Sequence, residues 1–271
     1  MGTRMGAFRI YFFALRLGFR VLKAGILVEG IKLLMTPVGY WRFLPFAFVW
    51  REFRRHRNPR VLDASSPKLL SLFLASKTSG PVYATDLDDG KIVTRWKRIA
   101  DVVGLNNYQV EYQDARRLSY PDEYFDFVYS ISVVEHIPED GDRLALAEFR
   151  RVMKRNGTLV LEVPYRPQRE EIFKTNDSKG HPSKTLQFYE RHYDAVTLKE
   201  RLEIQGLAIQ QKVILGERLP LEAALLSGRL PRFLRVALLP WEPALAAVNC
   251  WARPRDDRGR PGSALLVYRK S

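Results

Sequence analysis

Residues 60–76, RVLDASSPKLLSLFLAS, decide the fold class. Apolar residues lead to Asp63, where a buried strand would give way to a loop, and apolar residues at helical spacing follow from Pro67. Proline suits the first turn of a helix because its missing N–H would have no intrahelical partner there. A strand, a loop and a helix in this order are typical of a nucleotide-binding α/β unit, although SSPK here replaces the glycine-rich turn of such units.

Strand and helix signals alternate through the rest of the chain. Strand patterns cover residues 60–63, 82–87, 108–112, 124–130, 158–163, 207–215 and 264–269. Helix patterns cover residues 67–77, 91–103, 142–154 and 195–204, and Asn156 with Gly157 is the expected stop of the third. The alternation predicts an α/β protein with a Rossmann-like, doubly wound, mostly parallel seven-stranded sheet, whose sites lie at the carboxyl ends of the strands.

The chain is expected to divide into four segments. Residues 1–58 form a basic amphipathic helical extension, residues 59–216 the Rossmann-like cofactor-binding core, and residues 263–271 the last strand of that core. Residues 217–262, rich in Leu, Ala, Pro and Arg, are a helical insert between two strands that should pair as a hairpin. The insert is predicted to form a lid or a second membrane-facing patch.

Positive charge is concentrated in the N-terminal extension. The formal net charge is +14, and residues 1–60 hold 12 Lys or Arg against 2 acidic residues, so most of the excess lies there. An anionic partner surface is therefore expected. A membrane fits better than nucleic acid, because the basic residues lie among aliphatic side chains rather than in a polar groove with interleaved aromatics.

The extension has two open interpretations. Arg9, Arg16, Arg20 and Lys23 interrupt its apolar stretch, and each would cost roughly 2.5–3.5 kcal/mol at a bilayer centre, so no membrane span is expected. One helical face carries Phe8, Phe12, Leu15, Phe19, Leu22 and Ile26. Such a helix either lies in the interface of an anionic membrane, with its basic side chains reaching the headgroups, or docks on the protein's own core.

Cysteine and motif content exclude several classes of site. Cys250 is the only cysteine, so a disulfide framework and a cysteine-based zinc site are both excluded, and a reducing, cytoplasmic compartment fits. The His, Asp and Glu residues have no metal-ligand spacing, so no metal is expected. The absence of G-x-S-x-G and Walker patterns argues against a hydrolase and against an NTPase.

Three carboxylates directly follow predicted strands: Asp63, Asp86 and Asp114. A carboxylate at such a position can accept hydrogen bonds from a ribose diol or an adenine amino group, although a lone strand-end Asp is more often a helix cap. Asp86 follows the first loop by about 20 residues, the separation at which nucleotide-binding folds place the ribose-binding acid. Three such residues in successive units indicate a nucleoside-type cofactor.

The central part of the chain resembles a known family. Residues 114–137, DARRLSYPDEYFDFVYSISVVEHI, resemble the class I S-adenosylmethionine-dependent methyltransferase pattern D-x-x-x-L-P-F-x-D-x-x-F-D-x-V followed by S-x-x-x-E-H. Residues 149–164, FRRVMKRNGTLVLEVP, resemble the next helix, turn and strand, while VLDASS and VYATDLD resemble the two cofactor motifs. The likeness covers residues 60–164 and is closest to the broad subgroup that methylates small molecules and lipids.

The resemblance implies S-adenosyl-L-methionine as the cofactor and assigns its contacts to the ends of four strands. These are Asp63, Ala64 and Ser65 at the methionine end, Asp86 and Leu87 at the ribose, Asp114 and Ala115 at the adenine, and Ser130, Ile131 and Ser132 near the methyl group. The family's D-x-G-x-G-x-G pattern falls here on residues that include no glycine. Either the Ser65 and Ser66 N–H groups and the following helix hold the cofactor carboxylate, or side chains fill the pocket and the domain is not catalytic.

The chemistry needs an acceptor held against the methyl group and, for a hydroxyl acceptor, a base. The candidates are Glu135, His136 and His181, although the E-H pair is often structural in this family. His181 lies in a predicted loop after the fifth strand. The run Arg191–Tyr193 is expected to start the next helix, and surface or capping roles explain it equally well.

The sequence therefore predicts a methyltransferase (EC 2.1.1.-) that acts on a small or amphiphilic acceptor such as a lipid, an isoprenoid or a saccharide-lipid. Its expected place is the cytoplasm or, peripherally, the inner face of the membrane, and its oligomeric state is left open. A catalytically inactive methyltransferase-like scaffold is the alternative. A Rossmann-type oxidoreductase is disfavoured, because NAD binding depends even more on the missing glycine turn and the pattern at residues 114–164 would be unexplained.

Overall fold

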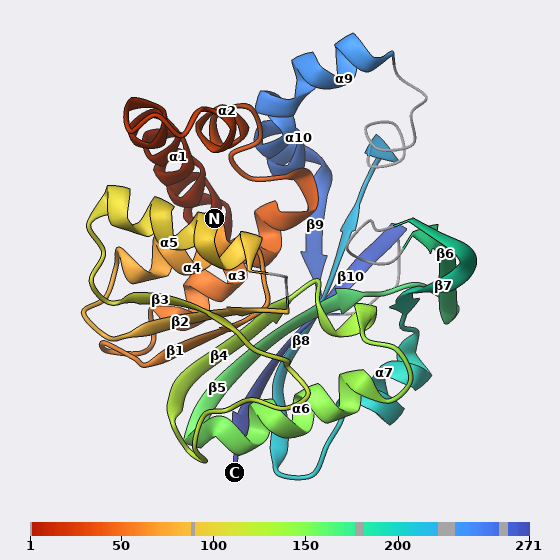
Figure 1. The fold of residues 1–271 in the computed structure, drawn as a ribbon. Coiled ribbons are helices and arrows are strands. Elements are labelled where there is room, and N and C mark those ends of the chain that lie inside the picture. The colour runs from red at the N-terminus through yellow and green to blue at the C-terminus, as the bar shows by residue number, and fades with distance from the viewer. Residues whose placement is uncertain (1, 88–89, 177–181, 222–230, 255–259) are drawn as a thin grey trace.

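A twisted eight-stranded sheet with helices on both faces forms the body of the protein (Figure 1). The computed structural model describes residues 2–271 except 88–89, 177–181, 222–230 and 255–259. The strands are β1 (Val61–Ala64), β2 (Val82–Asp86), β3 (Tyr108–Tyr112), β4 (Phe125–Ile131), β5 (Met153–Pro164), β6 (Glu170–Asn176), β7 (Pro182–His192), β8 (Leu207–Glu217), β9 (Cys250–Arg253) and β10 (Arg260–Lys270). The α-helices are α1 (Gly2–Lys23), α2 (Leu27–Met35), α3 (Phe43–Phe53), α4 (Lys68–Ala75), α5 (Lys91–Val103), α6 (Gly141–Val152), α7 (Ala195–Leu202), α9 (Arg232–Leu238) and α10 (Glu242–Asn249). Three short 3₁₀ turns are η1 (Tyr40–Arg42), η2 (Val134–His136) and η3 (Leu239–Trp241).

The strand order of the large sheet is β3-β2-β1-β4-β5-β10-β8-β9, and a separate hairpin pairs β6 with β7. Strands β3, β2, β1, β4 and β5 run parallel, whereas β10 is antiparallel to both of its neighbours, β5 and β8. The predicted doubly wound fold and the β8–β10 hairpin are thus confirmed. The sheet has an eighth strand, because residues expected to continue a helical insert form the edge strand β9 instead.

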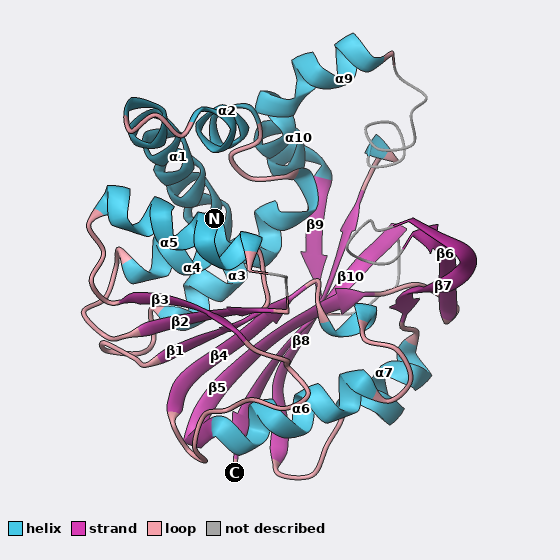
Figure 2. Ribbon diagram, in the orientation of Figure 1, coloured by secondary structure: helices cyan, strands magenta, loops and turns pink. Residues whose placement is uncertain are grey.

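Helices cover both faces of the sheet (Figure 2). Alternating residues of the strands belong to two hydrophobic layers, one on each face. Val61, Phe127 and Val160 face the layer that α1, α3, α4 and α5 cover. Leu62 and Leu161 face the opposite layer, where α6 and α7 pack. This alternation is the two-residue period of a sheet buried on both faces. Because β1, β2, β3 and β4 run parallel, their carboxyl ends meet at one rim of the sheet.

The N-terminal arm, defined here as α1, α2, η1 and α3, is part of the hydrophobic core. Its first helix buries a stripe at three- and four-residue spacing: Ala7, Ile10, Ala14, Leu17 and Val21. Phe13 packs edge-on against Phe73 of α4 at 5.4 Å. The expected face is not the one that docks, because Phe12 and Phe19 remain more than half exposed. No helix in the described part of the chain is long and apolar enough to cross a bilayer.

A buried polar network joins the insert to the arm. The Tyr40 N–H donates to the Glu242 carboxylate of α10 at 2.9 Å, and the Tyr40 hydroxyl donates to Glu217 at 3.2 Å. Asn249 donates to the Tyr40 hydroxyl at 2.6 Å. Elements separated by about two hundred residues are therefore fastened together, consistent with the neighbouring positions of α2 and α10 in Figure 1.

Two local expectations are wrong. Asn156 and Gly157 do not end a helix region but lie within β5, where Asn156 adopts a left-handed φ of 59°. Arg191 and His192 end strand β7 rather than starting a helix. Arg191 contacts the fully buried Asp142 of α6 at 3.1 Å, so this ion pair fixes the β6–β7 hairpin against α6.

Candidate active site

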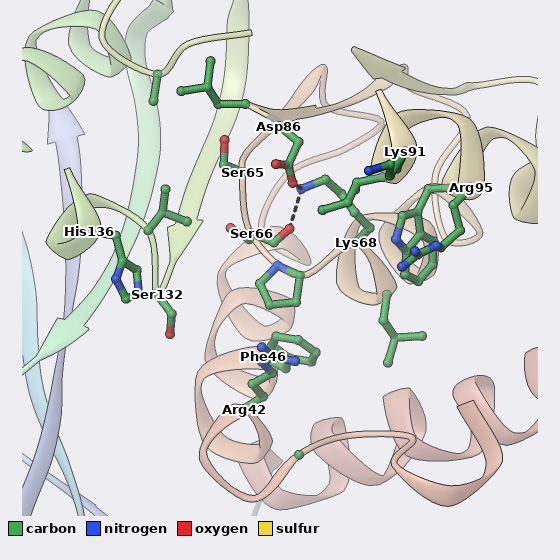
Figure 3. Close-up of a pocket in the computed structure, with 18 of the residues that line it drawn as sticks. Arg42, Phe46, Ser65, Ser66, Lys68, Asp86, Lys91, Arg95, Ser132 and His136 are labelled. Atoms are coloured by element: carbon green, nitrogen blue, oxygen red, sulfur yellow. Dashed lines mark hydrogen bonds and ion pairs between the residues drawn. The ribbon is translucent and has the colours of Figure 1, made fainter. Parts of the chain in front are cut away.

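A cavity of about 1050 Å³ opens at the rim where the parallel strands end (Figure 3). Residues after β1, β2, β3 and β4 form one wall, α5 forms a second, and the arm forms a third. The sequence-predicted residues that line it are Ser65, Asp86, Leu87, Asp114, Ala115, Ser132 and His136. Nothing in the strand pattern alone could show that the arm closes the cavity, because the arm residues lie far away along the chain.

In the corner after β1, Ser65 adopts a backbone conformation that usually requires glycine. Ser65 has a left-handed φ of 63°. Its N–H donates to the Asp63 carbonyl at 3.1 Å, and the Ser66 N–H donates to Asp63 Oδ1 at 2.8 Å. Ser66 Oγ accepts the Ile131 N–H at 2.9 Å, so this side chain is turned into the fold rather than into the cavity. The two N–H groups considered for a cofactor carboxylate are therefore already used within the corner.

Lys68 links that corner to the end of β2. Its Nζ donates to the Ser66 carbonyl at 2.6 Å and pairs with Asp86 Oδ2 at 3.0 Å (Figure 3). The Lys68 side chain is 2% exposed, whereas that of Asp86 is 20% exposed and lines the cavity. The lysine thus holds the carboxylate from the protein side, and neither Ser66 nor Lys68 fills the cavity.

Four predicted cofactor residues lie beneath the cavity instead of on its wall: Asp63, Ala64, Ser130 and Ile131. Asp63 is fully buried, and its burial raises the pKa of the carboxyl while the nearby charge of Lys68 opposes that shift. Ser130 Oγ donates to the Ala64 carbonyl at 3.1 Å, which ties β4 to β1. These residues are buried at the strand ends and do not line the cavity.

Asp114 is held by its neighbour Arg116. The Arg116 Nη2 lies 2.7 Å from Asp114 Oδ2, and Nε donates to Oδ1 at 3.0 Å. These hydrogen bonds hold the pKa of the Asp114 carboxyl below its ordinary value. Both side chains line the cavity, so an ionised carboxylate faces it at the end of β3.

His136 is the catalytic candidate that opens on the cavity. Its Nδ1 lies 2.7 Å from the Tyr189 carbonyl oxygen, which can only accept, so Nδ1 carries the proton. Its Nε2 lies 3.9 Å from a Glu135 oxygen and 4.0 Å from a Glu190 oxygen. Glu135 itself is buried, and burial followed by the charge of Glu162 raises the pKa of its carboxyl. His181 lies outside the described residues.

Sequence reasoning missed two groups of lining residues. The arm contributes Leu33, Val38, Arg42 and Phe46, and α5 contributes Lys91, Arg95 and Trp96. The apolar and basic composition of the arm was the available signal, but it could not show which of these side chains face the cavity. Among the described residues, no group of three or more His, Cys, Asp or Glu side chains suits a metal ion.

We expect a substitution series at Ser65 to measure the strain of the corner. Ser65→Gly should leave the free energy of unfolding unchanged or raise it, since a non-glycine residue at left-handed φ costs about 1–2 kcal/mol. Ser65→Val should lower it by a similar amount. Ser76, at φ −70°, is the matched control, because glycine there relieves no left-handed strain and only increases the conformational freedom of the unfolded chain. Urea unfolding checks this, and equal losses from glycine at both positions would contradict it.

Comparisons with known proteins agree with this geometry. A methyltransferase domain model matches residues 64–161, from the end of β1 into β5. Phosphatidylethanolamine N-methyltransferase of Cereibacter sphaeroides is 26% identical over 129 residues, covering 45% of this chain and 63% of that protein. The match thus spans less than two thirds of that relative's length.

Solved structures share the overall fold. The [4+2]-cyclase SpnF is 18% identical with a TM-score of 0.56, and 86% of each chain is covered. Coclaurine N-methyltransferase bound to N-methylheliamine and SAH is 13% identical with a TM-score of 0.53, covering 84% of this chain and 73% of that one. At these identities the likeness shows the fold, and a cyclase among the neighbours means that the reaction has to be argued from the site.

Proposed function

The chain belongs to the class I S-adenosylmethionine-dependent methyltransferases, and we propose that it methylates an amphiphilic acceptor at the surface of an anionic membrane. The observation that carries this proposal is the composition of the cavity walls. Strand-end carboxylates form one side, and the apolar and basic arm forms the other. The first side suits a nucleoside cofactor and the second an acceptor with apolar and charged parts.

The residues present fit the cofactor. Asp86 has one oxygen paired with Lys68 and lines a cavity large enough for a nucleoside, so its other oxygen can accept from a ribose hydroxyl. Asp114, Ser65 and Ser132 also line the cavity; Asp114 would accept from the adenine amino group, and the two serines would contact the rest of the cofactor. When bound, S-adenosylmethionine supplies an electrophilic methyl group. The protein's task is then to hold the acceptor in line and to take up its proton.

His136 is the proposed base. Because Nδ1 donates to the Tyr189 carbonyl, the lone pair of neutral His136 is on Nε2. The Glu190 carboxylate lies 4.0 Å from that atom and would stabilise the protonated ring. Ser132, whose Oγ donates to Glu162 at 3.0 Å, adds a polar contact on the same side of the cavity.

The amphiphilic acceptor is inferred from the arm. Leu33, Val38 and Phe46 give the cavity an apolar wall, and Lys32 and Arg42 add positive charge to it. This combination suits a molecule with a hydrocarbon part and an anionic group. The partial match to a phosphatidylethanolamine N-methyltransferase supports a lipid acceptor of this kind.

The membrane surface is inferred from the exposed side chains of the first two helices, α1 and α2. Phe12 and Phe19 on α1 and Leu27, Val28 and Ile31 on α2 are each more than half exposed. Arg9, Arg16 and Lys23 are exposed on α1 as well. Exposed apolar side chains with basic neighbours on the same helices are the pattern of interfacial binding to anionic lipids.

Calorimetry with S-adenosylhomocysteine tests the cofactor and base assignments. Wild-type protein should bind it in the micromolar range, and Asp86→Ala should lose about tenfold or more, because a charged hydrogen-bond acceptor is removed from the ribose. His136→Asn should bind normally but fail to transfer label from radioactive S-adenosylmethionine into a lipid extract. No heat for the wild type at millimolar ligand would leave the catalytically inactive scaffold as the function.

Co-sedimentation with vesicles tests the membrane surface. Deleting the arm would expose the core, so the informative variant is Phe12→Ser with Phe19→Ser, which changes only exposed side chains. We expect wild-type protein to sediment with phosphatidylglycerol–phosphatidylcholine vesicles but not with phosphatidylcholine alone, and binding should weaken with salt. The double variant should lose binding, whereas Leu186→Ser, at a side chain on β7 that is exposed even more than the two phenylalanines, should retain it. Unchanged binding of the double variant would contradict the surface assignment.

A further inference from the structure

Arg42 occupies a distinctive place in the cavity. It ends the 3₁₀ turn η1 between α2 and α3, and lies beside Phe46 on the arm wall (Figure 3). Its side chain is accessible, yet protein surrounds it closely enough that burial lowers the pKa of the guanidinium. The Arg42 side chain therefore lines the cavity and is accessible to a ligand there.

The guanidinium has no hydrogen-bond or ion-pair partner among the described residues. The carboxylates whose charges reach it are Glu162 and Glu242. Glu162 accepts from Ser132 at 3.0 Å, and Glu242 accepts from the Tyr40 N–H at 2.9 Å. Burial raises the pKa of both carboxyl groups, and the charge of Arg42 opposes that shift. The N–H donors of this guanidinium therefore face the cavity without a protein partner among the described residues, and a ligand with an anionic group can accept from them.

Three acidic side chains of the cavity wall are already in ion pairs with basic side chains. Asp86 pairs with Lys68, Asp114 with Arg116, and Glu29 with Arg95 at 3.2 Å. The N–H groups of Ser65 and Ser66 are used by Asp63. The usual anion-binding elements of such a loop are therefore occupied, and the positive charge left for an anion comes from the arm.

We propose that Arg42 is the oxyanion anchor of this cavity, binding a carboxylate or phosphate group of a ligand through its planar guanidinium. The proposal rests on the function proposed above, which supplies two sources of such a group: the aminocarboxylate of the cofactor and a phosphate of the lipid acceptor. A guanidinium matches both groups with two parallel hydrogen bonds, which a serine hydroxyl cannot provide. Arg42 would take the place of the loop N–H groups, which in this chain donate to Asp63.

Two pairs of ligands separate the sources. S-adenosylhomocysteine and 5′-methylthioadenosine share the adenosyl thioether, but the second lacks the aminocarboxylate. Dihexanoyl phosphatidate and dihexanoylglycerol share the acyl chains, but the second lacks the phosphate. Affinities are measured by calorimetry for wild type, Arg42→Met and Arg54→Met, which removes an exposed arginine at the end of α3 that does not line the cavity.

We expect Arg42→Met to weaken the anionic member of at least one pair by about tenfold or more, the usual loss for a charge-assisted hydrogen bond, and to leave its neutral partner within twofold. Loss confined to S-adenosylhomocysteine identifies the cofactor carboxylate, and loss confined to phosphatidate identifies the acceptor phosphate. Arg54→Met should change neither.

The proposal fails if Arg42→Met weakens neither anionic ligand, or weakens charged and neutral partners equally, as a merely structural residue would. If the wild type binds S-adenosylhomocysteine, and Arg42→Met alters neither that affinity nor the affinity for phosphatidate, this inference is contradicted. The proposed function is then unaffected. A wild type that binds none of the four ligands overturns both.

Discussion

The ion pair between Lys68 and Asp86 is the constraint on which the rest of the site depends. Glycines normally let the backbone after the first strand approach a cofactor, and this chain has none there. The structure meets the need by turning Ser65 into the left-handed region and drawing Ser66 inward to β4. Lys68 then spans from the corner to Asp86 and holds that carboxylate at the cavity wall.

The arm supplies the apolar and basic side chains of the cavity, on the side opposite the strand ends. Its buried stripe joins the core that covers β1, β4 and α4, so it is a fixed part of the fold. Its exposed apolar side chains lie on the two first helices, and the network around Tyr40 fastens the insert to it. One segment therefore connects the proposed membrane surface to the proposed acceptor pocket, which explains why basic and apolar residues are mixed along it.

The sequence predicted much of the fold because strand and helix periodicities are local. The helix at residues 91–103 and the strand at 108–112 agree with the structure at both ends. The β6–β7 hairpin escaped prediction, because its placement depends on the distant Asp142–Arg191 pair rather than on its own pattern. At the site, Asp86 and Asp114 were predictable as strand-end acids. Arg42 and Lys68 were not, because only the tertiary structure brings these two side chains to the cavity.

The most direct test of this account is the affinity of Lys68→Met for S-adenosylhomocysteine, with Lys77→Met, an exposed lysine just beyond α4, as the control. Removing the buried ammonium should leave Asp86 without its counter-ion and weaken binding by about tenfold, the usual scale for a partly buried charged pair. The control should bind like the wild type. Unchanged or tighter binding by Lys68→Met would show that the lysine does not support the carboxylate, and would contradict the account.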